Sequence, residues 1–450
     1  MPEDQPTILG WQEHYRRHVV TAEQAVANIQ DGDNVFTTIG HNVDVLIAAM
    51  IGSEKRLRWT PTAATDLRWL SSEVTEQIQV NTNFAMSDSR EALNDFRADF
   101  TPWWFQGGYK ALEDGRPGAR TIDVSMFRVS PPNRAGWCCF GNSLWDVKFT
   151  ATKARTAIAV ISDDVPRTFG DTWIRASDID WFVEEQQSSA ISNDMAARYR
   201  EGQRTAAAQP VARAIAGHIA SIVRDGDTLQ VGTGSMTASL GLAGAFDDKN
   251  DLGYFAEMTV PGIIELTQRG IITGLRLKSH PGKVVTTMAA GLPEDIAILH
   301  ENPAFEFYGF EYMHNPSAIA RNDNLVAINN ALVVDLTGQV AAGQLGARIW
   351  SGTGGQLSYH LGAFLSRGGR AVTVLPSTAR DGTVSRITAA MPAGQIVTIP
   401  RDLADLVVTE HGVADLLNKS QRERAQALIE IAHPMFRDEL RNQAKGMYGA

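Results

Sequence analysis

The sequence predicts an α/β protein of two similar domains, each built around a largely parallel sheet. Helix-like and strand-like patterns alternate along the 450 residues, as expected when strands are followed by covering helices. Two short runs, Ala157–Ile161 and Ala371–Leu375, are wholly apolar, which is typical of strands buried on both faces of a parallel sheet. An internal repeat provides the third observation.

The repeat begins in residues 21–40 and recurs in residues 212–234. In each copy, a helical pattern of Ala, Val and Ile ends in Asp-Gly-Asp, and an apolar run then enters a glycine. Asp31-Gly32-Asp33 matches Asp225-Gly226-Asp227 at an offset of 225 − 31 = 194, and the same offset carries Gly40 onto Gly234. Chance similarity between two helix–strand units is the alternative, but two matches at one offset favour duplication. Each copy predicts a helix, a turn, a strand and a loop that begins the next helix.

The remaining elements follow in chain order. Ile122–Val129 and Leu325–Leu336 are apolar strand patterns that end in turns. Residues 185–210 are polar, rich in Ser, Ala and Gln, and closed by Pro210, which indicates a linker. Ser420 and Glu423 form a capping-box pattern that opens a helix ending before Pro434. We therefore expect an N-terminal domain over residues 1–190, a linker over 191–210 and a C-terminal domain over 211–450.

A glycine-rich loop, Ser351-Gly-Thr-Gly-Gly-Gln356, is the most informative local feature. It contains Gly352, Gly354 and Gly355 and is followed by apolar residues at helical spacing. Glycine lets main-chain N–H groups approach a ligand closely, and a helix N-terminus adds partial positive charge. Such a loop can hold a phosphate or a developing oxyanion, although many loops of this kind are only tight strand–helix connections.

Composition excludes several classes of function. The net charge of −10 argues against a nucleic-acid partner, because no basic stripe is available to neutralise phosphates. The only cysteines, Cys138 and Cys139, are adjacent, so neither a disulfide nor a metal site is expected. The N-terminal residues lack the pattern of a secretory leader, and no apolar run is long enough to span a membrane. We therefore expect a cytoplasmic protein with no membrane partner.

Several motifs resemble those of one enzyme family. They are Ser351-GTGGQLSYHLGA, Leu375-Pro-Ser-Thr378, Ser385-Arg-Ile387, Val408-TEHGVADL, Lys419-SQRERA and Ile431-Ala-His-Pro434 in the second half, with Val129-Ser-Pro-Pro-Asn133, Pro166-RTFGD and Ser177-Asp-Ile-Asp180 in the first. Together they resemble the acetyl-CoA hydrolase/transferase family, which belongs to the class I, glutamate-dependent CoA-transferases. The resemblance covers nearly the whole chain and implies a duplicated α/β domain, with the active site between the two domains.

The resemblance also implies a catalytic nucleophile. Asp251-Leu-Gly-Tyr-Phe-Ala-Glu257-Met258, followed by Gly262, matches the family's pattern around its glutamate. Ala256 stands where a threonine is usual, and Thr259-Val-Pro261 also departs from the pattern. Without the resemblance, Glu257 would be an ordinary solvated carboxylate. With it, Glu257 is the residue expected to form an acyl-glutamyl anhydride and then a glutamyl–CoA thioester.

The implied activity is the transfer of CoA from an acyl-CoA to a carboxylic acid. CoA is then a substrate, and no other cofactor and no metal are required. Two alternatives are an acyl-CoA hydrolase of the same family and a CoA-binding homologue without turnover. The resemblance further implies a homodimer.

Further site residues follow from the same resemblance. Gly355, with Gly354, is expected to face the glutamyl carbonyl. The loop that contains Gly232, Gly234, Ser235 and Met236 is expected to face the acyl carbonyl, and a plain strand–helix turn is its alternative. Where the family often has Asn-Xaa-Pro beside the CoA pantetheine, this chain has His314-Asn315-Pro316, so either His314 or Asn315 is the expected donor.

Three consecutive aromatic residues bear on the choice of acyl group. Trp103, Trp104 and Phe105 lie in a part of the chain that, by resemblance, approaches the acyl group, and the 291–298 segment there departs from the family pattern. Large rings favour a bulkier acyl group than acetyl if they line the pocket. Packing in the core is the alternative, and it is the more common role of tryptophan.

Overall fold

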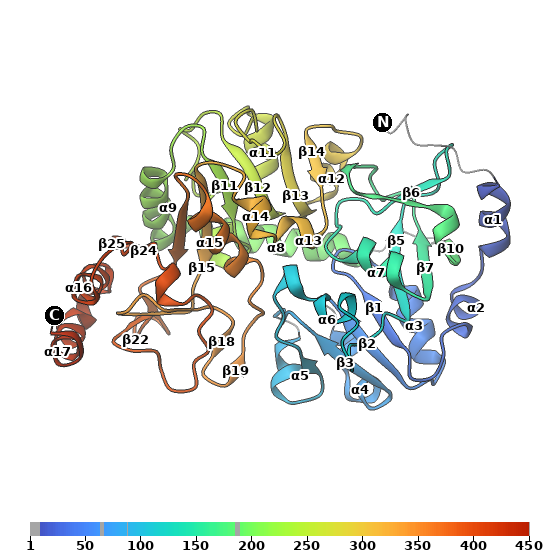
Figure 1. The fold of residues 1–450 in the computed structure, drawn as a ribbon, viewed down its shortest axis with the longest axis horizontal. Helices are drawn as coiled ribbons and strands as arrows, with labels where there is room; N and C mark the ends of the chain where they lie inside the picture. Colours follow the sequence, from blue (N-terminus) through green and yellow to red (C-terminus); the bar gives the residue numbers. More distant parts are fainter. Residues whose placement is uncertain (1–9, 64–66, 88, 185–189, 450) are drawn as a thin grey trace. The chain divides into compact units, whose positions relative to one another are not determined.

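The computed structural model describes residues 10–63, 67–87, 89–184 and 190–449. The chain forms two compact units (Figure 1). Unit 1 consists of Met1–Ala196 and Thr287–Tyr312, and unit 2 of Ala197–Thr286 and Met313–Ala450. Residues 1–9, where the sequence shows no leader pattern, lie outside the described residues.

A seven-stranded parallel sheet forms the centre of unit 1. Its strands follow the order β10-β7-β5-β1-β2-β3-β4. They span β1 Asn34–Thr37, β2 Leu57–Pro61, β3 Ile78–Thr82, β4 Asp99–Phe100, β5 Val124–Val129, β7 Thr156–Ile161 and β10 Trp181–Glu184. Every residue of β1 and β7 is buried, because helices cover both faces of such a sheet. The apolar run predicted at Ala157–Ile161 therefore forms a central strand.

Two helices of unit 1, α1 Trp11–His18 and α2 Ala22–Ala27, precede β1 in the sequence. Between the strands lie α3 Asp44–Gly52, α4 Ser72–Gln77, α5 Arg90–Asn94, α6 Lys110–Glu113 and α7 Val147–Lys153, and α12 Pro293–Leu299 lies in the 287–312 segment. The antiparallel pair β6 Trp137–Cys139 and β9 Trp173–Arg175 lies beside the sheet's core, which includes Cys138, Phe140 and Phe182. Both cysteines are buried and free.

Unit 2 repeats the same arrangement of strands. Its sheet has the order β25-β24-β20-β15-β11-β12 and continues into the first residues, 284–286, of β13. The strands are β11 Thr228–Val231, β12 Gly253–Thr259, β13 Val284–Ala289, β15 Leu325–Asn330, β20 Arg370–Val374, β24 Leu406–Thr409 and β25 Gly412–Asp415. Only β25 is antiparallel to its neighbour among the pairs β11–β12, β11–β15, β15–β20, β20–β24 and β24–β25.

The helices of unit 2 complete the α/β pattern. They are α9 Pro210–Ile222, α10 Ser235–Ala238, α11 Ile263–Gln268, α14 Pro316–Ile319, α15 Gln356–Leu365, α16 Gln421–Ile431 and α17 Pro434–Tyr448. Ser420 and Glu423 form the predicted capping box of α16. Pro434 occupies the first turn of α17, where its missing N–H costs no hydrogen bond. The predicted class, α/β with two largely parallel sheets, is confirmed.

The repeated Asp-Gly-Asp turns make the same hydrogen bonds in both units. Asp33 Oδ2 accepts from Gln30 N at 2.7 Å, and Asp227 Oδ2 accepts from Arg224 N at 2.7 Å. The first aspartate of each turn also accepts from a backbone N–H. Asp31 accepts from Arg56 N at 2.8 Å, and Asp225 accepts from Asn250 N at 2.9 Å. Each turn thereby ties a helix to the strand that follows it. These equivalent contacts support duplication rather than chance similarity.

Each second aspartate also pairs with an arginine next to an equivalent strand. Arg155 Nη2 lies 2.6 Å from Asp33 Oδ2, and Arg370 Nη2 lies 2.6 Å from Asp227 Oδ1. The arginine side chain is 43% exposed in the first pair and 14% in the second. Arg370 Nη2 has the distance of an ion pair without the alignment of a hydrogen bond, so charge attraction dominates this contact.

Two features of the chain's division differ from the prediction. The segment predicted as a linker forms helix α8, Ala190–Ala208, because its Ala, Met and Arg residues are good helix formers; residues 185–189 lie outside the described residues. Residues 287–312 belong to unit 1. There, Leu144 N donates to Thr287 O at 2.8 Å, and β14 Phe305–Phe307 pairs with β8 Phe169–Gly170. The unit boundary therefore does not follow a single break in the sequence.

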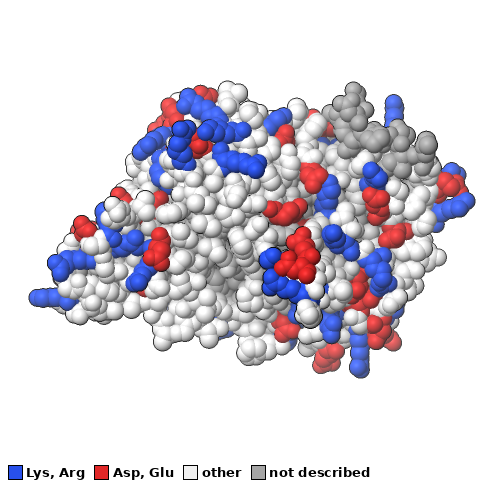
Figure 2. All heavy atoms as spheres, viewed as in Figure 1, with Lys and Arg blue, Asp and Glu red and all other residues white. Residues whose placement is uncertain are grey.

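The face shown in Figure 2 carries acidic and basic side chains intermixed, with no continuous basic stripe. Around strands β18 Gln344–Leu345 and β19 Arg348–Ile349 it is mostly uncharged, and Leu345 and Trp350 are exposed there. Among the described residues, none of the helices has the length and apolar character needed to cross a lipid bilayer.

The repeated turns generate a prediction about stability. We expect Asp227→Ala to lower the free energy of unfolding by about 3–5 kcal/mol, because it leaves Arg370 buried without its counter-charge. Asp33→Ala also removes a side-chain acceptor of a backbone N–H, but the arginine that it leaves behind is half-exposed. The expected loss in the free energy of unfolding is therefore about 1–2 kcal/mol. Chemical denaturation followed by circular dichroism measures both values.

Asp438→Ala is the control, because both members of its ion pair are exposed: the Asp438 side chain is 93% exposed and that of Arg441 is 50% exposed. Its effect should stay within about 0.5 kcal/mol. Equal losses for Asp227→Ala and Asp33→Ala would contradict the role assigned to burial of the arginine.

Candidate functional site

Glu257 lies near the carboxyl end of β12, a strand whose first four residues are buried. The carboxyl ends of parallel strands are the usual position of ligand sites in α/β sheets. Thr286 Oγ1 donates to Glu257 O at 3.2 Å, and Tyr254 Oη donates to Met258 O at 2.5 Å. These two bonds fix the backbone on either side of the carboxylate. The Glu257 side chain is 13% exposed, so it is mostly enclosed but still within reach of solvent.

The Glu257 carboxylate lies directly against the backbone of Gly355. A Cβ atom at residue 355 would lie 2.4 Å from Glu257 Oε2 and 2.9 Å from the ring of His314. No side chain fits in that space, so glycine is required by close approach rather than by backbone angle. Gly355 is the N-cap of α15, where the first backbone N–H groups have no partner within the helix. The second half of the predicted glycine loop therefore meets the predicted nucleophile.

The other glycines of this loop shape its path. Gly354 has φ of 58°, a left-handed conformation that disfavours residues with a Cβ. Gly352 is buried, and Ser351 Oγ donates to Gly352 O at 2.9 Å. These residues turn the chain into α15 and bring Gly355 to the carboxylate.

His314 also contacts Glu257. The His314 side chain is fully buried, and its Nε2 lies 2.8 Å from Glu257 Oε2. A carboxylate only accepts hydrogen bonds, so this contact is a hydrogen bond when His314 Nε2 carries a proton. Asn315 instead caps helix α14, since its Oδ1 accepts from Ser317 N at 2.9 Å. Of the two alternatives left open by the sequence, His314 therefore approaches the glutamate and Asn315 has a structural partner.

The second predicted loop follows β11 and is held by β15. A Cβ at Gly232 would lie 2.8 Å from Asn329 Oδ1, and one at Gly234 would lie 2.4 Å from Asn330 Nδ2. Asn330 Oδ1 accepts from Thr237 N at 3.0 Å, which secures the start of α10. Ser235 is exposed and Met236 half-buried in the first turn of α10. Both glycines are required because asparagine side chains lie against their backbone.

Asn329 and Asn330 were not anticipated by sequence reasoning. Asn329 exchanges two hydrogen bonds with Gln230, at 2.8 and 3.2 Å. Two consecutive asparagines at the end of an apolar strand could have indicated these contacts. Side-chain amides are uncommon in buried strands unless both the oxygen and the nitrogen of the amide are hydrogen-bonded.

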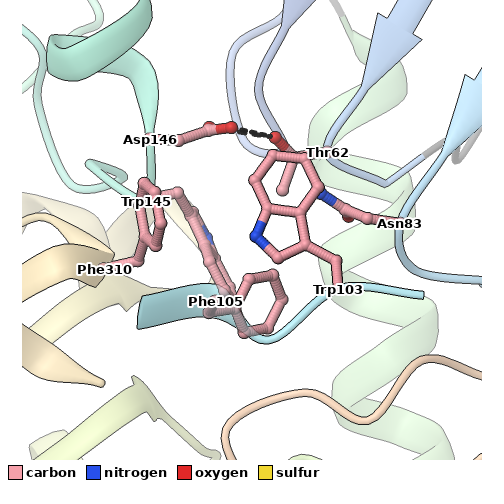
Figure 3. Close-up of a pocket in the computed structure, with 7 residues that line it drawn as sticks. All are labelled: Thr62, Asn83, Trp103, Phe105, Trp145, Asp146 and Phe310. Carbon is pink, nitrogen blue, oxygen red and sulfur yellow. Dashed lines mark hydrogen bonds between the residues drawn. The ribbon is translucent and has the colours of Figure 1, made fainter. Parts of the chain in front are cut away.

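The aromatic residues of unit 1 pack against one another (Figure 3). Trp103 meets Tyr109 edge-on at a ring distance of 4.8 Å. Phe105 lies 5.4 Å from Trp145 and 6.4 Å from Phe310. The space among them is too small for a water molecule. Trp104 is 38% exposed. Trp103 and Phe105 are therefore packing residues here, which is the second of the two interpretations drawn from the sequence.

A buried carboxylate lies beside this aromatic cluster. Asp146 accepts hydrogen bonds from Thr38, Thr62 and Tyr109 at 2.7 to 2.9 Å. Burial raises the pKa of the Asp146 carboxyl, while the three hydroxyl donors oppose that shift. No sequence pattern identified this group in advance.

Comparisons with known proteins find similarity along nearly the whole chain. The family model of the acetyl-CoA hydrolase/transferase N-terminal domain matches residues 4–191, and that of the C-terminal domain matches residues 291–444. The chain is 36% identical over 448 residues to a 4-hydroxybutyrate coenzyme A transferase of Clostridium kluyveri, covering 97% of this chain and 99% of the relative. It is 32% identical over 444 residues to a succinyl-CoA:cyclohexane-1-carboxylate CoA transferase of Geobacter metallireducens, with 97% of each chain covered.

Solved structures show the same fold over almost the whole chain. The crystal structure of RipA from Yersinia pestis matches with a TM-score of 0.85 at 30% identity, covering 97% of this chain and 99% of that one. A 4-hydroxybutyrate CoA-transferase from Porphyromonas gingivalis matches with a TM-score of 0.75 at 29% identity, covering 97% and 100%. The two domain models, the full-length relatives and the shared fold show that this chain belongs to the acetyl-CoA hydrolase/transferase family.

Proposed function

We propose that this CoA-transferase moves CoA from an acyl-CoA to a free carboxylic acid through covalent intermediates on Glu257. The observation that carries the proposal is the position of the Glu257 carboxylate, which lies against Gly355 at the start of α15 and is hydrogen-bonded by His314. A carboxylate held by one donor, with backbone N–H groups beside it, has the parts that acyl transfer needs.

The reaction begins with attack of a Glu257 oxygen on the thioester carbonyl carbon. The carbonyl electron pair moves to oxygen, and when the carbonyl re-forms, CoA leaves as a thiolate with the electrons of the C–S bond. The product is a mixed anhydride of Glu257 and the acyl group. The thiolate then attacks the glutamyl carbonyl carbon, and the first acid leaves as its carboxylate. Glu257 now carries CoA as a thioester, so the thioester energy stays on the protein.

A second carboxylic acid completes the cycle by the same steps in reverse. Its carboxylate attacks the glutamyl–CoA carbonyl and displaces the thiolate, which then attacks the acyl carbon of the new anhydride. The new acyl-CoA leaves, and Glu257 is again a free carboxylate. No proton needs to be moved by a general base, because each nucleophile is already an anion.

Backbone groups of unit 2 are suited to stabilise the oxyanions. Gly355 lies against a glutamyl carboxyl oxygen, and the backbone N–H groups of the first turn of α15 follow it. The Gly232–Met236 loop is proposed to face the acyl carbonyl, as the family resemblance implies. Its rigid attachment to Asn329 and Asn330 supports this role, because an oxyanion site works only if its donors are fixed in advance.

CoA is a substrate in this scheme, and no further cofactor is used. The names of relatives refer to 4-hydroxybutyrate, cyclohexane-1-carboxylate and butyryl-CoA as substrates. We propose a small monocarboxylic or hydroxycarboxylic acid. The family resemblance supports a cytoplasmic homodimer, and light scattering after gel filtration tests the oligomeric state.

Glu257→Gln should lower turnover at least roughly a thousandfold, because the amide cannot act as the nucleophile. The assay follows conversion of butyryl-CoA in the presence and absence of acetate. Wild-type enzyme should be fast only with the acid, whereas equal rates without it would indicate a hydrolase.

Glu265→Gln serves as the matched control, because Glu265 is an exposed carboxylate on α11. It should behave as the wild type. A Glu257→Gln variant with near wild-type turnover would exclude the covalent mechanism.

Gly355→Ala should lower kcat about a hundredfold, which corresponds to about 3 kcal/mol of barrier, the cost typical of losing one oxyanion donor. The new Cβ would lie 2.4 Å from Glu257 Oε2, so the carboxylate has to move away. Gly217→Ala is the control, because Gly217 lies within α9 with open space at its Cβ. That variant should keep its activity and gain up to about 1 kcal/mol of stability. Unchanged kcat in a folded Gly355→Ala variant would show that Gly355 serves only to turn the chain.

His314→Ala should lower kcat by about ten- to a hundredfold, because the glutamate loses the donor that holds it in position. Asn315→Ala should instead lower the free energy of unfolding by about 1 kcal/mol through loss of the α14 cap. Steady-state kinetics and denaturation on both variants separate the two roles. A larger kcat loss from Asn315→Ala than from His314→Ala would reverse the assignment.

A further inference from the structure

We propose that Tyr359 is a catalytic hydrogen-bond donor, whose hydroxyl binds the oxyanion that forms on the carboxyl carbon of Glu257. This inference rests on the proposed covalent role of Glu257. Tyr359 lies one helical turn after Gly355, the glycine that the carboxylate contacts. Tyr359 N donates to Gly355 O at 3.0 Å in the first turn of α15.

The position of the ring places Tyr359 in the immediate surroundings of Glu257. Its ring lies 5.8 Å from the ring of His314 at 73°, an edge-to-face contact. His314 in turn holds Glu257 Oε2 at 2.8 Å. Residues four apart on a helix share one face, so Tyr359 and Gly355 face the carboxylate from the same side of α15.

The Tyr359 hydroxyl has no hydrogen-bond partner among the described residues, although its side chain is completely buried. Buried polar groups are nearly always paired, and those that are not require an explanation. Tyr254 shows the usual solution, because its hydroxyl donates to Met258 O. Folding alone would be served at least as well by phenylalanine at residue 359. The unpaired hydroxyl therefore points to a partner that is present only during the reaction.

A second unpaired donor lies on the same turn. Gln356 is 6% exposed, and its Nε2 is buried without a partner among the described residues. It directly follows Gly355 and is three residues before Tyr359, so both side chains lie on one face of the helix. Two unmet polar groups on the turn that follows Gly355 indicate that this part of α15 is built to receive further oxygen atoms.

The chemistry requires a donor that keeps its proton. Burial, together with the nearby charge of Glu257, raises the pKa of the Tyr359 hydroxyl well above its usual value. When the thiolate or a carboxylate attacks the glutamyl carbonyl carbon, the carbonyl electron pair moves to oxygen. Tyr359 donates a hydrogen bond to that oxygen without transferring the proton. The carbonyl then re-forms and the leaving carboxylate or thiolate departs with its electron pair, so Tyr359 ends each step unchanged.

Tyr359→Phe tests this role, because it removes one oxygen atom and keeps the ring against His314. We expect kcat to fall about a hundredfold, as for other oxyanion donors, with KM for acyl-CoA within twofold of the wild type. The thermal midpoint should rise slightly, because an unpaired buried hydroxyl is removed. In single-turnover experiments, the glutamyl–CoA adduct seen by intact-protein mass spectrometry should form more slowly by the same factor.

Tyr199→Phe is the matched control. The Tyr199 hydroxyl is also buried and unpaired among the described residues, but Tyr199 is on α8 and is not part of the proposed site. This variant should raise the thermal midpoint in the same way and leave kcat unchanged. Turnover of Tyr359→Phe within twofold of the wild type, or a thermal midpoint that falls, would overturn the inference. Absence of the adduct from wild-type enzyme would instead overturn the proposed function itself.

Discussion

The chemistry of this protein depends on the contact between a carboxylate and a bare stretch of backbone. Glu257 Oε2 comes so close to Gly355 that even a methyl group would not fit between them. This contact requires a glycine at the start of α15, a strand that carries Glu257 near its carboxyl end and a buried histidine that contacts the same carboxylate oxygen. Each of these parts has little value alone. Together they hold an anionic nucleophile next to donors that can stabilise the charge passing through its carboxyl group.

The surrounding sheet provides the rigidity that such a contact needs. The Asp-Gly-Asp turn before β11 fixes the end of α9, and Asn329 and Asn330 at the end of β15 fix the loop that follows β11. The same turn occurs before β1 in unit 1, with the same hydrogen bonds. Duplication thus supplied two similar sheets, and only the second copy carries the glutamate, the histidine and the glycine that contact one another.

Much of this arrangement could be predicted from the sequence because it depends on local patterns. Apolar runs identified β7 and β20, the capping box identified the start of α16, and the repeat was visible as spaced Asp-Gly-Asp motifs. Glu257 could not be separated from the other acidic residues by local pattern and was identified by resemblance. Contacts between distant residues were not predictable: the bond from His314 to Glu257 joins residues 57 positions apart, and the cluster of Trp103 with Tyr109 and Phe310 depends on how residues 287–312 return to unit 1.

The most direct test of the account is to locate the covalent intermediate. Enzyme incubated with acyl-CoA alone is treated with borohydride, digested and mapped by mass spectrometry. Reduction of a glutamyl–CoA thioester converts the carboxyl group to an alcohol, and the account predicts this change at Glu257 and at no other acidic residue. Full turnover with an unmodified Glu257, or modification of a different carboxylate, would contradict the central claim.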